Sequence, residues 1–464
     1  MWQEHIPPTT ALHKTRGLFV FIHDTLLTRR GVIAYLPVII ATVCMFCGAS
    51  WQIFLPKTDP ARYQCYALTF WMGSNATHLL PSAQCNFLAL SSTQPAFHML
   101  PLEYPPLTLI PFSLALLTPL AYYQLSFALL MSLAMVFVYW ILLRFGPKGA
   151  ALAFAIYMFI GAIATAQVRY DLIPAGLTLL SLIAVERKHW TAGYIALAFG
   201  VLFKIYPILL LPTLFLAEQH ARGRLALLPA DAKITALPRQ LWSLLGSARR
   251  WRYHNLLLFL VLVSGVTGFF AIFNFQSAVL GQISYFVKRP IQIEATGSSL
   301  LWLGSRMGFP ISINDNYGSL NIVSGLGGIV GIMSTCLLLL GTAYTLWLQW
   351  RGKLDMTQAC IALLLVFVAS GKVFSPQYLI WLIPLLVYAG AFDGVNLVLW
   401  SAISLITTYI YSYLYTRPVA SLLDIPYIPG FVEAVSARNA FFVLFTLAYL
   451  FNWFQIRERK PLQI

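Results

Sequence analysis

The chain of 464 residues is 59% apolar and only 10% charged, and its mean hydropathy is +0.75. Soluble domains carry about 25% charged residues, so this composition excludes a soluble domain and predicts a membrane protein with many spanning helices. The formal charge of +15 is interpreted through topology, because Lys and Arg collect in the cytoplasmic loops of membrane proteins. No nucleic-acid partner is expected.

Apolar runs between charges predict about twelve membrane crossings, because a spanning helix needs about 20 mostly apolar residues. The predicted runs are 32–55, 121–143, 150–168, 172–186, 190–203, 205–217, 255–275, 321–349, 356–370, 378–393, 396–415 and 439–456. The predicted fold class is therefore an all-α polytopic membrane protein. It has a short cytoplasmic segment at 1–30 and one transmembrane domain at 31–464.

The positions of Lys and Arg predict the orientation of this bundle. A further apolar run at 107–120 is short and rich in proline, which removes backbone donors and interrupts helices, so we interpret it as an interfacial or re-entrant segment. Every basic cluster then lies on the inner side. Both termini are thus predicted to be cytoplasmic, with a basic inner loop at 218–254 and a large first outer loop at 56–104.

Two apolar stretches are each interrupted by a lysine and a proline. Residues 190–217 are broken at Lys204-Ile205-Tyr206-Pro207, and residues 356–393 are broken around Lys372 and Pro376. Each break is predicted to form the outer turn between two short helices. Charges at such depth are costly and usually face a cavity or a partner; for Lys204, the alternative is that its ammonium group snorkels to the surface.

Acidic and basic residues gather in the predicted outer segments. They include Asp59, Glu103, Arg169, Asp171, Lys204, Arg289 and Lys372. A carboxylate at this face can accept a proton from a hydroxyl, and Lys or Arg stabilises an anionic leaving group. The combination favours group transfer from a lipid phosphate. The alternative is a secondary transporter or flippase for an anionic lipid or organic anion, with a site built from the two broken helix pairs.

The sequence has no spacing typical of metal or nucleotide sites. His78 and His98 share no helix register, and neither a phosphate-binding nor a dinucleotide-binding glycine motif is present. Neither a metal nor another cofactor is therefore expected. Cys65 and Cys85 lie in the same outer loop, where a disulfide and two free thiols remain alternatives.

Five short segments place these charges in recognisable motifs. They are Asp59 just after the first span, Glu103-Tyr104-Pro105-Pro106-Leu107, Arg169-Tyr170-Asp171, Phe203-Lys204-Ile205-Tyr206-Pro207, and Gly371-Lys372-Val373-Phe374-Ser375-Pro376-Gln377-Tyr378. In this order, they resemble the bacterial polyprenyl-phosphate-mannose-dependent mannosyltransferases of the GT-C superfamily. The Lys-Ile-Tyr-Pro segment is also similar to one in the eukaryotic GPI mannosyltransferase.

The resemblance implies an all-helical, inverting glycosyltransferase that acts on the extracytoplasmic face of the cell membrane. Its donor would be a polyprenyl-phosphate hexose, expected to be mannose, and its acceptor a lipid or glycan. Asp59 matches the family's catalytic aspartate, and Asp171 matches a second acidic residue in the second outer loop. One departure is that Pro60 directly follows Asp59, where the family often has an aliphatic residue and a tyrosine. The roles of Arg62 and the nearby tyrosines therefore stay open.

The motifs and charges described above predict roles for nine residues. Asp59 is predicted to be the general base, and Lys204, Lys372 and Arg289 are predicted to bind the donor phosphate. The residues predicted to support them are Glu103, Arg169, Asp171, Tyr206 and Gln377. Glu103 and Asp171 are expected to orient the cations or the acceptor. For Asp171, a structural ion pair with Arg169 is an equal alternative.

Overall fold

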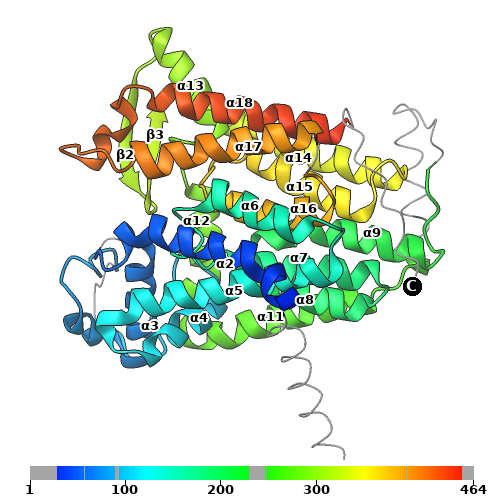
Figure 1. Cartoon of the computed structure of the whole chain (residues 1–464), viewed down its shortest axis with the longest axis horizontal. Coiled ribbons are helices and arrows are strands. Elements are labelled where there is room, and N and C mark those ends of the chain that lie inside the picture. Colours follow the sequence, from blue (N-terminus) through cyan, green and yellow to red (C-terminus); the bar gives the residue numbers. More distant parts are fainter. Residues whose placement is uncertain are drawn as a thin grey trace, which may run out of the picture.

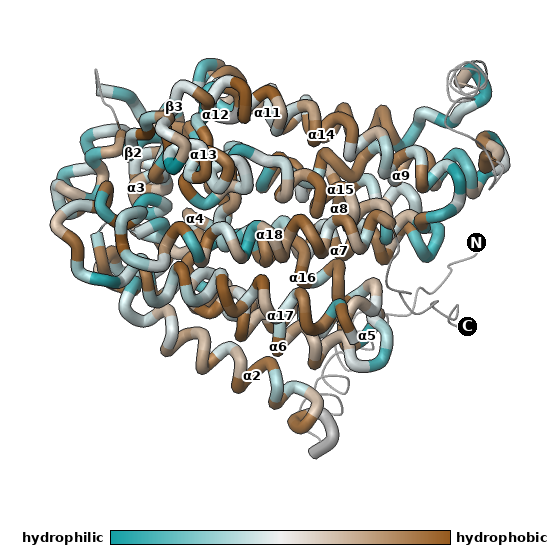
Figure 2. The backbone as a smooth tube through the Cα atoms, turned by 90° about the horizontal axis from the view of Figure 1, so that it is seen from above, coloured by the Kyte–Doolittle hydropathy of each residue, from teal (hydrophilic) through white to brown (hydrophobic). Residues whose placement is uncertain are grey.

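Helices that run alongside one another dominate the computed structural model, which describes residues 29–56, 58–88, 93–228, 246, 248–392 and 394–451. The connecting segments gather at two ends of the helical body (Figure 1). Polar residues are concentrated at these ends, and apolar residues fill the helical segments between them (Figure 2). Residues 1–28 of the segment predicted at 1–30, and residues 229–245 and 247 of the basic loop predicted at 218–254, lie outside the described residues.

Each of the twelve predicted apolar runs coincides with helical structure. The helices are α2 (Arg29–Ala49), α5 (Tyr123–Phe145), α6 (Ala150–Ala162), α7 (Leu172–Glu186), α8 (Trp190–Phe203), a 3-10 turn (Tyr206–Leu210) with α9 (Leu211–Ala221), α11 (His254–Phe275), α14 (Gly327–Trp350), α15 (Met356–Ser370), α16 (Tyr378–Tyr388), α17 (Gly394–Tyr409) and α18 (Phe431–Leu450). The chain therefore folds mainly into apolar helices, which is consistent with an all-α membrane protein.

Among the described residues, six helices are long and apolar enough to cross a membrane. They are Val32–Gln52, Leu120–Phe145, His254–Tyr285, Gly327–Trp350, Gly394–Leu414 and Phe431–Leu450. The shorter apolar helices have 10–17 residues, which is less than the ~20 residues that a perpendicular span needs. Twelve crossings thus stay a prediction.

The proline-rich run at 107–120 forms a short, irregular helix. It consists of a 3-10 turn (Pro106–Thr108), α4 (Leu109–Leu114) and a second 3-10 turn (Ala115–Leu117). At 1.5 Å per residue, this helix is roughly 18 Å long, well short of the ~30 Å hydrocarbon core. It packs against α3 (Asp59–Met72). Other predicted crossings are as short, so the interfacial or re-entrant segment stays a prediction.

Both predicted breaks are present in the structure. Helix α8 ends at Phe203, and Lys204 is extended while its backbone N–H still donates to Gly200 O at 2.9 Å. Helix α15 ends at Ser370, and α16 begins only at Tyr378. The lysine and proline in each stretch therefore mark turns between short helices, as predicted.

A small antiparallel sheet lies in the segment between α11 and α14. Its strands, in the order β1-β3-β2, are β1 (Ile291–Gln292), β2 (Ile311–Asn316) and β3 (Ser319–Ser324), and α12 (Gln282–Lys288) and α13 (Thr296–Arg306) flank β1. The prediction of a helical run from residue 321 was therefore wrong at its start, because α14 begins at Gly327. Strand pairing explains why residues 321–324 are not helical: Ile322 of β3 lies opposite both Ile291 of β1 and Ile313 of β2.

Helix α18 begins earlier than the predicted run at 439–456. It starts at Phe431 after Gly430, whose φ of 87° is in the left-handed region. Arg438, predicted to precede the span, therefore lies inside the helix and is fully buried. Its charge is accommodated there because its guanidinium donates to the backbone oxygen of Glu294 and lies 3.7 Å from the centroid of the Phe374 ring.

A disulfide joins Cys65 of α3 to Cys85, which decides between the two alternatives left open by the sequence. A hydrogen-bonded glutamine supports the same connection. Gln84 Nε2 donates to Ala61 O at 3.0 Å and to Gln64 Oε1 at 2.8 Å. The disulfide and this glutamine fix the segment after α3 against the body of that helix.

Replacing Cys65 and Cys85 together with Ser is expected to lower the melting temperature of the detergent-solubilised protein. A disulfide across this sequence separation of 20 contributes ~3 kcal/mol in the chain-entropy view. Differential scanning fluorimetry measures the effect, with Cys44→Ser, an exposed free cysteine, as the control. Equal melting temperatures for the double variant and the wild type would contradict this role.

Candidate active site at the sheet end

The site lies at the end of the bundle that carries α3 and the three-stranded sheet, here called the sheet end (Figure 1). Asp59 is the first residue of α3, and Pro60 follows in its first turn, where the missing N–H of proline costs no helical hydrogen bond. Thr58 caps the helix and donates to Gln124 Oε1 at 2.8 Å. The departure from the family motif at Pro60 therefore suits the start of a helix, and α5 fixes the position of Asp59.

Asp59 forms an ion pair with Arg169. The distance from Arg169 Nη2 to Asp59 Oδ2 is 2.5 Å, and the two side chains are 23% and 18% exposed, respectively. The pKa of Arg169 is raised, because the nearby Asp59 carboxylate and tyrosines outweigh burial, which acts to lower it. The guanidinium thus stays charged, and the pair is partly open to solvent.

A second ion pair joins Asp171 and Lys204. Asp171, just before α7, is fully buried, and its Oδ1 accepts from Lys204 Nζ at 2.5 Å and from the indole N–H of Trp381. Two alternatives from the sequence are thereby corrected. Asp171 does not pair with Arg169, because each has another partner, and Lys204 does not snorkel, because its ammonium group points to a buried carboxylate.

A third ion pair joins Arg62, one turn after Asp59, to Glu103. The Arg62 guanidinium lies 4.6 Å from the centroid of the Phe87 ring. The turn of the β2–β3 hairpin also reaches this group, because a Cβ atom built on Gly318 would lie 2.6 Å from Arg62 Nη1. Burial raises the pKa of Glu103, although Arg62 opposes that shift. Arg62, whose role the sequence left open, is thus part of the site.

A cluster of tyrosines lies between the three ion pairs. The ring centroids of Tyr63, Tyr104 and Tyr170 are 5.4 to 5.7 Å apart. The hydroxyl groups of Tyr63 and Tyr170 are buried and, within the described part of the chain, have no hydrogen-bond partner. These aromatic rings pack among the ion pairs, and Lys204 Nζ lies 4.9 Å from the centroid of the Tyr170 ring.

Arg289 and Lys372, two of the three cations predicted to bind the donor phosphate, have no acidic partner within 4.0 Å among the described residues. Arg289, just after α12, donates to Ser319 Oγ at 2.9 Å. It is close enough to Glu103 to lower the pKa of that carboxyl. Lys372 Nζ lies 3.4 Å from the backbone oxygen of Val287. Their charges are therefore not neutralised within the site.

Tyr206 and Gln377 differ in their relation to the ion pairs. The Tyr206 ring stacks on Trp381 at 4.1 Å between centroids, so it supports the residue that binds Asp171. The amide oxygen of Gln377 accepts from Ser375 Oγ, and among the described residues no hydrogen bond joins the Gln377 side chain to an ion pair. Trp381 was missed by the sequence analysis, although it lies one helical turn after Tyr378 of the last motif and stacks on it at 4.0 Å.

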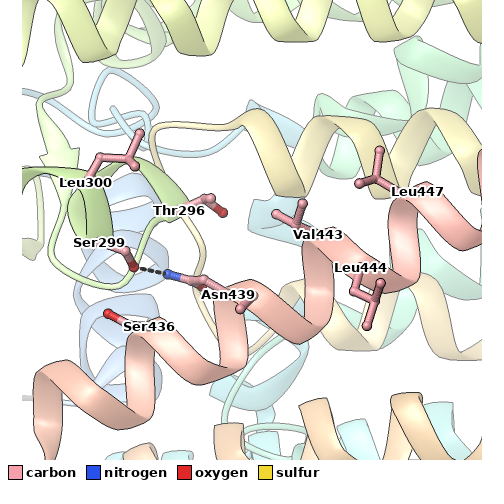
Figure 3. Close-up of a pocket in the computed structure, with 9 residues that line it drawn as sticks. Thr296, Ser299, Leu300, Ser436, Asn439, Val443, Leu444 and Leu447 are labelled. Carbon is pink, nitrogen blue, oxygen red and sulfur yellow. Dashed lines mark hydrogen bonds between the residues drawn. The ribbon is translucent and has the colours of Figure 1, made fainter. Parts of the chain in front are cut away.

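A separate groove of about 390 Å³ lies between α13 and α18 (Figure 3). Its lining consists of Thr296, Ser299, Leu300, Ser436, Asn439, Ala440, Val443, Leu444 and Leu447. Asn439 Nδ2 donates to Ser299 Oγ at 3.0 Å across it. None of the site residues predicted from the sequence lines this groove. Within the described ranges, no group of three or more His, Cys, Asp or Glu residues is placed to hold a metal ion.

Breaking one half of the buried Asp171–Lys204 pair is expected to destabilise the protein by about 3–5 kcal/mol, because it leaves the other charge unpaired. We therefore expect Asp171→Asn and Lys204→Met each to lower the melting temperature in detergent. The double variant should lose less stability than the sum of the two single variants. Additive losses in this double-mutant cycle would show that the two side chains do not stabilise each other.

Comparisons of the chain with protein-family models, with curated proteins and with solved structures find no match. The resemblance to the GT-C mannosyltransferases therefore has only the five motifs behind it. The structure adds that residues from four of these motifs, Asp59, Glu103, Arg169-Tyr170-Asp171 and Lys204, meet in one polar cluster at the sheet end.

Proposed function

We propose that the protein is an inverting membrane glycosyltransferase that transfers a hexose, expected to be mannose, from a polyprenyl phosphate to a hydroxyl group of a lipid or glycan. The observation that carries the proposal is the cluster of three ion pairs around Asp59, Asp171 and Glu103 at one end of the helical bundle. Carboxylates and cations placed together supply a proton acceptor and stabilisation for an anionic leaving group.

The charges of the cluster suggest how the donor is bound. In each of the three ion pairs, a cation is neutralised by a carboxylate. Arg289 and Lys372 add positive charge without such a partner, which favours an anion such as a phosphate. We therefore assign the donor phosphate to Arg289 and Lys372, and we assign Lys204 to holding Asp171.

Asp59 remains our proposed general base. Arg169 binds its Oδ2, and no described residue donates a hydrogen bond to its Oδ1, which is thus available for a proton. In the proposed reaction, the acceptor oxygen bonds to the anomeric carbon while the bond from that carbon to the phosphate oxygen breaks. The hydroxyl proton passes to Asp59, and polyprenyl phosphate leaves. Attack opposite the leaving group inverts the anomeric centre.

The disulfide supports an extracytoplasmic site. Cys65 and Cys85 are bonded within a few residues of the ion pairs of α3, and disulfides form and persist in oxidising compartments. Helices α2 and α18 are oriented so that the start of α2 and the end of α18 lie farther from the sheet end than their other ends do (Figure 1), in keeping with cytoplasmic termini.

Asp59→Asn is expected to reduce sugar transfer about 10²- to 10⁴-fold, because positioned proton transfer contributes about this much. The assay incubates purified protein with polyprenyl-phosphate mannose and fractionated membrane lipids, and mass spectrometry identifies the products. Asp315→Asn, in an exposed position on β2, is the matched control. Transfer by Asp59→Asn at the wild-type rate would rule out the assignment of the base, and absence of transfer by the wild type would contradict the proposed function.

Arg289→Gln and Lys372→Met are each expected to raise the KM for the donor about 10- to 100-fold, because hydrogen bonds to charged groups contribute ~1.5–3 kcal/mol. Steady-state kinetics at varied donor concentration measure the effect. Lys288→Met removes an exposed charge next to Arg289 and is the control. An unchanged KM in both site variants would locate the donor phosphate elsewhere.

A further inference from the structure

Arg289 and Lys372 lie on two segments that are joined by hydrogen bonds of one residue, Gln292. Gln292 is buried in β1, three residues after Arg289. Its backbone N–H donates to Lys372 O at 2.9 Å, and its side-chain Oε1 accepts from the backbone N–H of Phe374 at 3.0 Å. Gln292 therefore binds the chain on both sides of residue 373. It connects the segment of Arg289 directly to the segment of Lys372.

Arg438 of α18 also contacts both segments, the one after β1 and the one that contains Lys372. Its guanidinium lies 3.7 Å from the centroid of the Phe374 ring and donates to the backbone oxygen of Glu294. The next residue, Asn439, donates to the oxygens of Glu294 and Ala295 at 3.3 and 3.1 Å. The connection between β1 and α13 is thereby bound to α18, and the Lys372 segment packs on the same arginine.

The π-helical turn that follows α17 (Ile410–Leu414), together with Tyr415 just after it, adds a further anchor. The carboxylate of Glu294 accepts hydrogen bonds from the hydroxyl groups of Tyr411 and Tyr415. Glu294 and Arg438 are both fully buried, and burying charged groups costs several kcal/mol in desolvation. Apolar side chains would fill this space without that cost, but they would not give directional hydrogen bonds to the backbone between β1 and α13. The arrangement is therefore suited to fixing positions rather than to packing alone.

We infer that Gln292 and Arg438 are positioning residues that set the spacing of Arg289 and Lys372, so that both cations reach one phosphate group. This inference rests on the proposed function, because it assumes that these two cations bind the donor. Neither positioning residue touches the phosphate. Each contributes by keeping the Lys372 segment in its binding geometry before the ligand arrives, which lowers the ordering cost of binding.

If Gln292 and Arg438 are positioning residues, their substitution should affect donor binding more than the chemical step. Gln292→Leu removes the acceptor of the Phe374 N–H but leaves the backbone N–H that binds Lys372 O. Arg438→Met keeps apolar contact with Phe374 but loses the hydrogen bond to Glu294. For each variant we expect the donor KM to rise roughly 2- to 10-fold, while kcat stays within about twofold of the wild type, because the Asp59 pair lies on other segments.

The decisive experiment is a double-mutant cycle on binding of sugar-free polyprenyl phosphate to the full chain in detergent, followed by tryptophan fluorescence. Lys372→Met, Gln292→Leu and their combination are compared, and melting temperatures identify variants that fold. If Gln292 acts through Lys372, the combination should bind no more than about twofold more weakly than Lys372→Met alone. Arg438→Met in the same background gives an independent second cycle.

The outcomes separate this inference from the proposed function. Additive losses in both cycles, or wild-type affinity in Gln292→Leu and Arg438→Met, would overturn the positioning role while leaving the donor site in place. A wild-type protein that does not bind polyprenyl phosphate would overturn the donor site and the inference together. Non-additive losses in folded variants, with a raised KM and a retained kcat, would support the inference.

Discussion

The arrangement of the sheet end depends on one constraint, which is that a charge removed from water inside a helical bundle needs a partner. Asp171 is fully buried, and its Oδ1 is bound by Lys204 and the indole of Trp381, whereas its Oδ2 has no hydrogen-bond partner among the described residues. To reach that carboxylate, the chain breaks after α8 and extends Lys204 toward α7. The same requirement joins Asp59 to Arg169. These pairs bring α3, α7 and α8 together at one end of the molecule.

Pairing also divides the cations into two groups with different uses. Arg62, Arg169 and Lys204 are each neutralised by a carboxylate, so their charges chiefly hold segments in place and orient acidic groups. Arg289 and Lys372 bind neutral oxygen atoms of the chain and keep their charge available. The proposed site for an anionic lipid would use both groups, because a rigid frame lowers the ordering cost of binding and free positive charge provides the attraction.

A buried polar network connects the segments that carry Arg289 and Lys372 to α18. Gln292, Glu294 and Arg438 connect β1 to the segment after α15 and to α18. The small sheet is part of this frame, since the β2–β3 turn also contacts Arg62. Helices close to the C-terminus, which carry none of the five motifs, thereby influence the geometry of residues that do.

The sequence alone was sufficient to predict a mainly helical fold with apolar helices, the approximate positions of twelve helical segments, both breaks at lysine and proline, and the convergence of most of the predicted outer charges. These features depend on local composition, helix-breaking chemistry and the cost of charge in an apolar medium, all of which are present in the order of residues. Tertiary structure decided the partners: Asp171 with Lys204 instead of Arg169, Cys65 with Cys85, and Arg438 inside α18. Tertiary structure also decided that β3 is a strand, because β3 pairs with β1 and β2, with Ile322 opposite Ile291 and Ile313. Such choices depend on contacts between segments far apart in the chain, and no local pattern records them.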